Sequence, residues 1–147
     1  MSPRDAGFTL LELLVVLAIV SFLAVTLSGR GSRGVDSVRM ETTVRSVVMD
    51  LARARGAAMA SGRQTLFVVD AETARYQAGA DTAKDLPRGT RIALVTASRE
   101  RMDEARGAIR FYPDGGATGG RITLRASNGH ERTITVDWLS GHVSLSP

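Results

Sequence analysis

A single apolar run near the N-terminus constrains this chain more than any other feature of its sequence. From Phe8 to Leu27 the sequence reads FTLLELLVVLAIVSFLAVTL, in which Glu12 is the only charged residue among 20. A helix of that length rises about 30 Å, which matches the hydrocarbon core of a bilayer. We therefore expect residues 8–28 to form a helix that can span a membrane.

Glu12 is the unusual member of this run. An unpaired charge one turn inside an apolar helix costs on the order of a few kcal/mol in a bilayer, and a plain anchor has no use for it. A single interfacial glutamate could also extend to the lipid headgroups. Gly7 lies directly before the run and follows a short polar leader whose Arg4 is compatible with a cytoplasmic N-terminus.

Three interpretations of this segment compete. A secretory signal peptide would be cut near Ser28 or Gly29, but Glu12 interrupts the apolar stretch that it needs. A permanent signal anchor has the right length, yet it leaves the carboxylate without a partner. The third interpretation is the one we favour, because Gly7-Phe8-Thr9-Leu10-Leu11-Glu12 closely resembles the class III signal of type IV pilins and pseudopilins.

This resemblance implies how the N-terminus is processed. In that superfamily a prepilin peptidase cuts after the glycine on the cytoplasmic side and methylates the new N-terminus. Residues 1–7 would then be a leader, Phe8 the methylated first residue, and Glu12 the fifth residue of the mature chain. The new α-amino group would lie about one helical turn from Glu12, and opposite charges pair strongly in an apolar medium. In a staggered bundle the acid of one subunit can meet the amine of its neighbour.

Residues 29–62 are expected to form a hinge and then an amphipathic half of the helix. Three glycines fall within residues 29–34, GRGSRG, and should weaken or break the helix there. Helical periodicity then resumes and ends at Gly62 and Gln64. Its apolar positions are Val44, Val47, Val48, Leu51 and Ala54 or Ala58, and its polar positions are Arg45, Asp50, Arg53 and Arg55.

The arginines that follow the apolar run bear on orientation. Arg30, Arg33 and Arg39 come directly after it, and the positive-inside rule counts them mildly against a periplasmic C-terminal part. The class III motif outweighs that count. We expect a single-pass inner-membrane protein with a cytoplasmic N-terminus and a periplasmic head.

Residues 63–147 predict a β-rich head. Strands are expected at residues 64–70, 91–95, 108–112, 121–124 and 133–138, and a short last strand places Val143 and Leu145 on the core side. In the strand at 133–138, alternation predicts that Ile134, Val136 and Trp138 face inward. Asn128-Gly129 is a strong hairpin signal. The polar tract 96–107 predicts a surface loop or one helical turn, where a partner could contact the head.

The head sequence extends the resemblance to one subfamily. The long helix, the strand after LARARGAAMASGRQ and the segment from Phe111 to Gly120 resemble the general secretion pathway protein H family of minor pseudopilins over nearly the whole chain. This resemblance implies a pilin-like α+β fold, in which the long helix packs on an antiparallel β-sheet head. It also implies a minor subunit of the type II secretion pseudopilus, with other pseudopilins, prepilin peptidase and the inner membrane as partners.

Catalytic and ligand-binding motifs are weak. The chain has no cysteine, and the glycines from Gly115 to Gly120 precede an alternating strand rather than a helix, so a β-turn is favoured over a phosphate site. His130 and His142 have no second ligand at metal spacing. The tail WLSGHVSLSP has no acidic cluster like the calcium loop of major pseudopilins. We therefore expect no enzyme activity, cofactor, metal or small-molecule ligand.

One alternative function remains open, a minor type IV pilin that acts in pilus biogenesis or binds DNA during uptake. The formal net charge is +4, with 19 basic and 15 acidic residues. Relatives of that kind carry basic C-terminal residues, whereas no arginine follows Arg132 here. A patch of Arg121, Arg125 and Arg132 could still meet phosphates. On balance the sequence disfavours nucleic acid as a partner.

Overall fold

One long helix leads into a head made of two small sheets. The computed structural model describes the backbone of residues 9–146 and the side chains of residues 9–25 and 38–146. Helix α1 runs from Leu10 to Ser61, and the chain divides into two units, Met1–Asp36 and Ser37–Pro147. The leader, Gly7 and Phe8 lie outside the described residues.

The three glycines at residues 29–34, which were expected to weaken or break the helix, do not break it. The backbone stays helical through all three glycines. A glycine inside a helix costs about 1 kcal/mol relative to alanine, whereas a break requires a second, unfavourable nucleation. A break would also leave N–H and C=O groups without partners at two new helix ends.

The second half of α1 carries a buried stripe, as its periodicity predicts. Buried residues recur at alternating intervals of four and three, which keeps them on one face of a helix. Gly62, with φ of +65°, ends the helix in the left-handed conformation that glycine tolerates best. The stripe consists of Met40, Val44, Val47, Leu51, Ala54 and Ala58.

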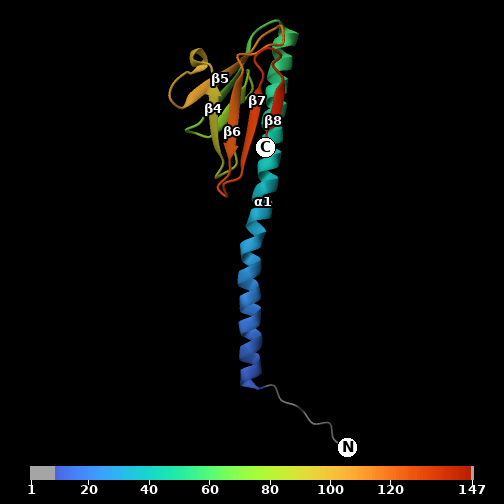
Figure 1. The fold of residues 1–147 in the computed structure, drawn as a ribbon, viewed down its shortest axis with the longest axis vertical. Coiled ribbons are helices and arrows are strands. Elements are labelled where there is room, and N and C mark those ends of the chain that lie inside the picture. Colours follow the sequence, from blue (N-terminus) through green and yellow to red (C-terminus); the bar gives the residue numbers. More distant parts are fainter. Residues whose placement is uncertain (1–8, 147) are drawn as a thin grey trace, which may run out of the picture. The chain divides into compact units, whose positions relative to one another are not determined.

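Two antiparallel sheets accompany this half of the helix (Figure 1). The first has the order β3-β2-β1-β5 and comprises β1 (Thr65–Asp70), β2 (Arg75–Ala78), β3 (Lys84–Asp85) and β5 (Arg106–Phe111). The second has the order β4-β6-β7-β8 and comprises β4 (Arg91–Thr96), β6 (Gly120–Arg125), β7 (Glu131–Val136) and β8 (Val143–Ser146). A short 3₁₀ helix, η1, covers Ser98–Glu100 after β4.

Both sheets bury one face in a common core with the helical stripe. Strand β1 lies between β2 and β5, as its apolar sequence predicts, and buries Phe67 and Val69. In the second sheet Ile122, Leu124 and Ile134 are fully buried. The predicted α+β fold, with a helix packed on antiparallel sheets, is confirmed.

Several strand predictions need correction. Trp138, expected inward, has an exposed fraction of 67%. Strand β7 ends at Val136 because the Asp137 carboxylate accepts hydrogen bonds from the backbone N–H groups of the next turn. Leu145 pairs opposite Ile134 and so lies on the core face, but it is 46% exposed because β8 is an edge strand. Strands β2 and β3 were not predicted.

A close contact at Gly141 ties the helix to two loops. Arg55 on α1 donates from Nε to the carbonyl oxygens of Gly115, at 2.9 Å, and Ser140, at 3.1 Å. Gly141 has φ of +62°, and a Cβ built there would collide with the Gly115 carbonyl oxygen. The position therefore requires glycine for both its backbone angle and its space.

We predict that Gly141→Ala lowers the free energy of unfolding by about 2–4 kcal/mol, from left-handed strain plus overpacking. Gly129→Ala is the matched control, because Gly129 also has a positive φ, +84°, but a Cβ there meets nothing within 4 Å. The control should lose only about 1 kcal/mol. Urea unfolding of both variants measures the difference, and equal losses would contradict the contact.

Candidate functional site

The first described turns of α1 present large apolar side chains on every side. Such a helix needs lipid or other helices to cover it. Over the part of the chain that the structure describes, no helix is both long enough and apolar enough to cross a membrane. The exposed side chains are Leu10, Leu11, Leu13, Leu14, Val15, Val16, Leu17, Ile19, Val20, Phe22, Leu23 and Val25.

Glu12, the predicted assembly residue, lies in the first turn of this helix. Its backbone N–H donates to the side-chain oxygen of Thr9 at 3.3 Å and to the Thr9 carbonyl oxygen at 3.1 Å. Thr9 therefore caps the helix, and the spacing of Thr9 and Glu12 is that of a capping box. Thr-x-x-Glu directly before an apolar run is the sequence signal of this cap, which the expectations from the sequence did not include. A negative charge here also favours the helix N-terminus.

A buried carboxylate links the helix to the first sheet. Asp50, predicted on the polar face of α1, is only 4% exposed, so that prediction is wrong. Its Oδ2 accepts hydrogen bonds from Tyr76 Oη at 2.9 Å and Lys84 Nζ at 2.7 Å, and its Oδ1 pairs with Arg53. The Tyr76 ring stacks on Phe67 with centroids 5.4 Å apart. These partners make burial of the charge tolerable.

The pKa of Asp50 reflects two opposed effects. Burial alone would raise it, but hydrogen bonds from Lys84 and Tyr76, with the charges of Lys84 and Arg53, outweigh burial and lower the pKa below its ordinary value. The Tyr76 hydroxyl lies in the same cluster, and burial raises its pKa. The cluster therefore favours an ionised Asp50 beside a neutral tyrosine.

The tract 96–107 is anchored more firmly than its polarity predicts. Glu100, within the expected surface loop, is 5% exposed. Its carboxylate accepts two hydrogen bonds from Arg110 on β5, from Nε and Nη2, each at 3.1 Å. The bond to Glu100 raises the pKa of Arg110. The one helical turn expected in this tract is the 3₁₀ helix η1.

The glycine segment and the two histidines, for which no ligand was expected, lie in or next to turns. Gly116 donates its N–H to Asp114 Oδ1 at 3.0 Å, which stabilises the turn at Pro113-Asp114-Gly115. The glycine segment leads into strand β6, not into a helix N-terminus that could hold phosphate. His130 follows the Asn128 turn, and His142 precedes β8. Among the described residues, no three His, Asp or Glu side chains gather as a metal site.

Strand register splits the predicted basic patch. Arg132 pairs opposite Leu124, a core residue, and so lies on the inner face of the second sheet, where its Nε is 4.0 Å from a Glu41 carboxylate oxygen. Arg121 and Arg125 alternate with the core residues of β6 and lie on the outer face. The three arginines therefore do not form one surface.

An apolar N-terminal helix whose second half packs on antiparallel sheets defines a pilin-like subunit. Two solved structures share this fold, both of the minor pseudopilin EpsH from the type II secretion system of Vibrio cholerae. Their TM-scores are 0.56 and 0.54, at 14% and 17% sequence identity. The matches cover 72% and 74% of this chain and 94% of each EpsH chain.

Sequence comparison identifies the family. Residues 43–141 match the family described as Type II transport protein GspH, and residues 2–28 match the prokaryotic N-terminal methylation motif. Type II secretion system protein H of Xanthomonas campestris pv. campestris is 30% identical over 141 residues, which cover 96% of this chain and 83% of that protein. The chain belongs to the GspH family of type II transport proteins.

We predict that Asp50→Asn lowers the free energy of unfolding at pH 7 by about 1–3 kcal/mol, because it weakens the hydrogen bonds that the buried Tyr76 and the charged Lys84 make to this carboxylate. Asp81→Asn is the matched control. Asp81 is 50% exposed and lies 3.5 Å from the same Arg53, so its loss should cost under about 0.5 kcal/mol.

The effect of Asp50→Asn should also depend on pH. The pKa of Asp50 is lower in the folded chain than the unfolded value of about 3.9, so its stabilisation is complete above that value. It is lost as pH falls through the folded pKa. The difference between wild type and Asp50→Asn in urea unfolding should therefore shrink below about pH 4. A difference that is constant down to pH 2 would contradict this assignment.

Proposed function

We propose that this chain is a minor pseudopilin, a structural subunit of a type II secretion pseudopilus that supports protein export and catalyses no reaction. One observation carries the proposal: a capped helix, apolar on every side over residues 10–25, lies within the segment that matches the methylation motif and holds a single carboxylate in its first turn. A head that buries its own core leaves this helix to be covered by lipid or by other subunits.

We propose that the chain is made as a precursor in the inner membrane. Prepilin peptidase would cut between Gly7 and Phe8 on the cytoplasmic side and methylate Phe8. The helix of residues 8–28 would span the membrane once, and the head would lie in the periplasm. The methylation motif over residues 2–28 supports this order of events.

The role proposed for Glu12 is to set the position of each subunit in the filament. An ionised carboxylate among apolar side chains is stabilised most by a nearby cation. Cleavage supplies a cation of that kind, the α-amino group of Phe8, on every neighbouring subunit. Pairing of Glu12 with a neighbour's amine would cancel two buried charges and fix the stagger between helices.

We predict that the protein isolated from its host begins at N-methylated Phe8. Intact-mass and N-terminal analysis should show the loss of residues 1–7 and the gain of one methyl group. In a host without prepilin peptidase the mass should be that of the full precursor. A native chain that keeps its first seven residues would contradict the proposed processing.

The second prediction separates the charge of Glu12 from its place in a capping box. Glu12→Gln keeps a side chain suited to the box but removes the charge, whereas Thr9→Ala removes the cap and keeps the carboxylate. Both variants should insert and be cleaved. We expect Glu12→Gln to fail to enter filaments and to lose secretion, while Thr9→Ala assembles. Normal secretion by Glu12→Gln in place of the wild type would refute the role of the charge.

A further inference from the structure

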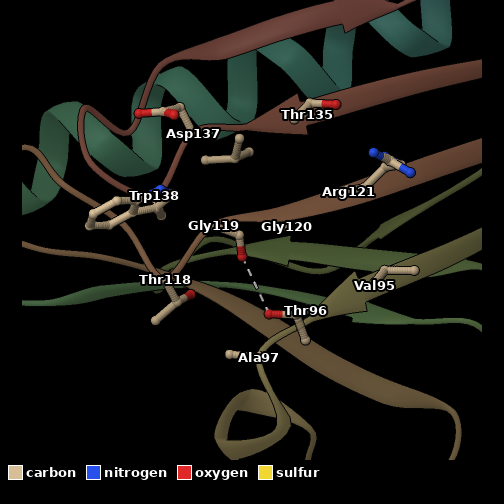
Figure 2. A pocket seen from close by; sticks show the side chains of 11 residues that line it. Val95, Thr96, Ala97, Thr118, Gly119, Gly120, Arg121, Thr135, Asp137 and Trp138 are labelled. Carbon is tan, nitrogen blue, oxygen red and sulfur yellow. Dashed lines mark hydrogen bonds between the residues drawn. The ribbon is translucent and has the colours of Figure 1, made fainter.

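An open groove of about 550 Å³ lies on the outer face of the second sheet (Figure 2). Val95 on β4, Arg121 on β6 and Thr135 on β7 are cross-strand neighbours, and they form a row along one side of it. Trp138, beyond the end of β7, lies on the other side. The groove thus draws on three strands and the turn that follows them.

Two glycines form the floor of the groove. A Cβ on Gly119 would lie 2.9 Å from the Trp138 Cβ, and a Cβ on Gly120 would lie 2.9 Å from the Val95 carbonyl oxygen. Gly119 also has φ of +72°, which disfavours any side chain. A side chain at Gly119 would displace Trp138, whereas one at Gly120 would meet the Val95 carbonyl oxygen and the buried Ile109 side chain, so backbone lines the groove at both positions.

The walls combine side chains that are enriched at protein interfaces. Val95 is 69% exposed and Trp138 is 67% exposed. A single exposed apolar residue needs no explanation. This groove, however, is faced by a tryptophan and an arginine, two of the residue types that contribute most binding energy at protein interfaces.

Arg121 supplies an unbalanced charge. Among the described side chains, those of residues 9–25 and 38–146, no carboxylate lies within ion-pair distance of its guanidinium. Asp137 lines the groove, but its Oδ1 already accepts from the Leu139 N–H at 3.1 Å and from the Ser140 N–H and hydroxyl at 2.8 Å each. The Thr96 hydroxyl donates to the Ala108 carbonyl at 2.8 Å. Arg121 therefore remains to meet a charge from outside the chain.

We propose that this groove docks a surface segment of another subunit of the same filament, one that carries a carboxylate next to an aliphatic or aromatic side chain. The carboxylate pairs with Arg121, and the apolar side chain packs between Val95 and Trp138. A second copy of this chain is a poor occupant, because it carries the same net charge of +4. This inference rests on the proposed function, since it requires a filament partner.

The groove can be probed directly because the chain has no cysteine. Val95→Cys gives a unique site for an environment-sensitive dye, and Ser127→Cys, in the turn between β6 and β7, gives a matched exposed site away from the groove. The full-length labelled chain, in detergent, is titrated with each purified pseudopilin of the same system. We expect one of them to shift the emission at Val95→Cys saturably and leave Ser127→Cys unchanged.

Charge reversal tests the carboxylate. Arg121→Glu should weaken that titration at least tenfold, because like charges then face each other. Arg91→Glu is the control, since Arg91 lies on the same outer face opposite Arg125. Equal weakening by both substitutions would overturn the role of Arg121, and so would an unchanged affinity. A shift that appears when the labelled chain is concentrated alone would show self-association and overturn the choice of partner.

Co-elution on size exclusion distinguishes the two possible failures. If a pseudopilin co-elutes with the wild-type chain but shifts neither label, the groove is not the docking site and the proposed function stands. If no pseudopilin of the system co-elutes with the wild-type chain, the proposed function fails and this inference falls with it.

Discussion

The fold depends on one stripe of α1 that serves as the wall of a core shared by two sheets. Met40, Val44, Val47 and Leu51 are at most 3% exposed, and both sheets close the same cluster of buried residues. Neither sheet has a second layer of its own, so each needs the helix to bury its inner face. This half of α1 is amphipathic because only one of its faces packs on the core, whereas residues 10–25 lie outside the core and are apolar on all sides.

Periodic patterns in the sequence predicted most of the head, because burial on one face imposes them. The helical stripe and the strands around Phe67, Ile122 and Ile134 were predictable, because burial of one face of a helix or strand fixes the spacing of its apolar residues along the sequence. The failures are positions where local chemistry overrides the period. Asp137 ends β7 with its own carboxylate, so Trp138 turns outward. Asp50 is buried because Tyr76 and Lys84 reach it from strands too short or too polar to predict.

Glu12 and the groove likewise differ in whether the sequence alone could reveal them. Glu12 stands out in the sequence because a lone charge in an apolar run is conspicuous from local information. The groove could not be foreseen, since Val95, Arg121 and Trp138 become neighbours only through the pairing of β4, β6 and β7. Pairing likewise separates Arg132 from Arg121, which sequence proximity had grouped together. Spatial neighbours from distant segments require the register, which the patterns alone do not specify.

The buried Asp50 also makes the attachment of the two sheets chemically unequal. The first sheet is held to the helix by apolar packing and by a carboxylate that Tyr76 and Lys84 contact from β2 and β3. The second sheet is held mainly by apolar packing, with a long Arg132–Glu41 contact and the hydrogen bond from Arg55 to the Ser140 carbonyl. Acid and salt act on ionic contacts and leave apolar burial largely intact. Acid below about pH 4, which protonates Asp50, therefore weakens the attachment of β2 and β3 to the helix and leaves the apolar attachment of the second sheet largely intact.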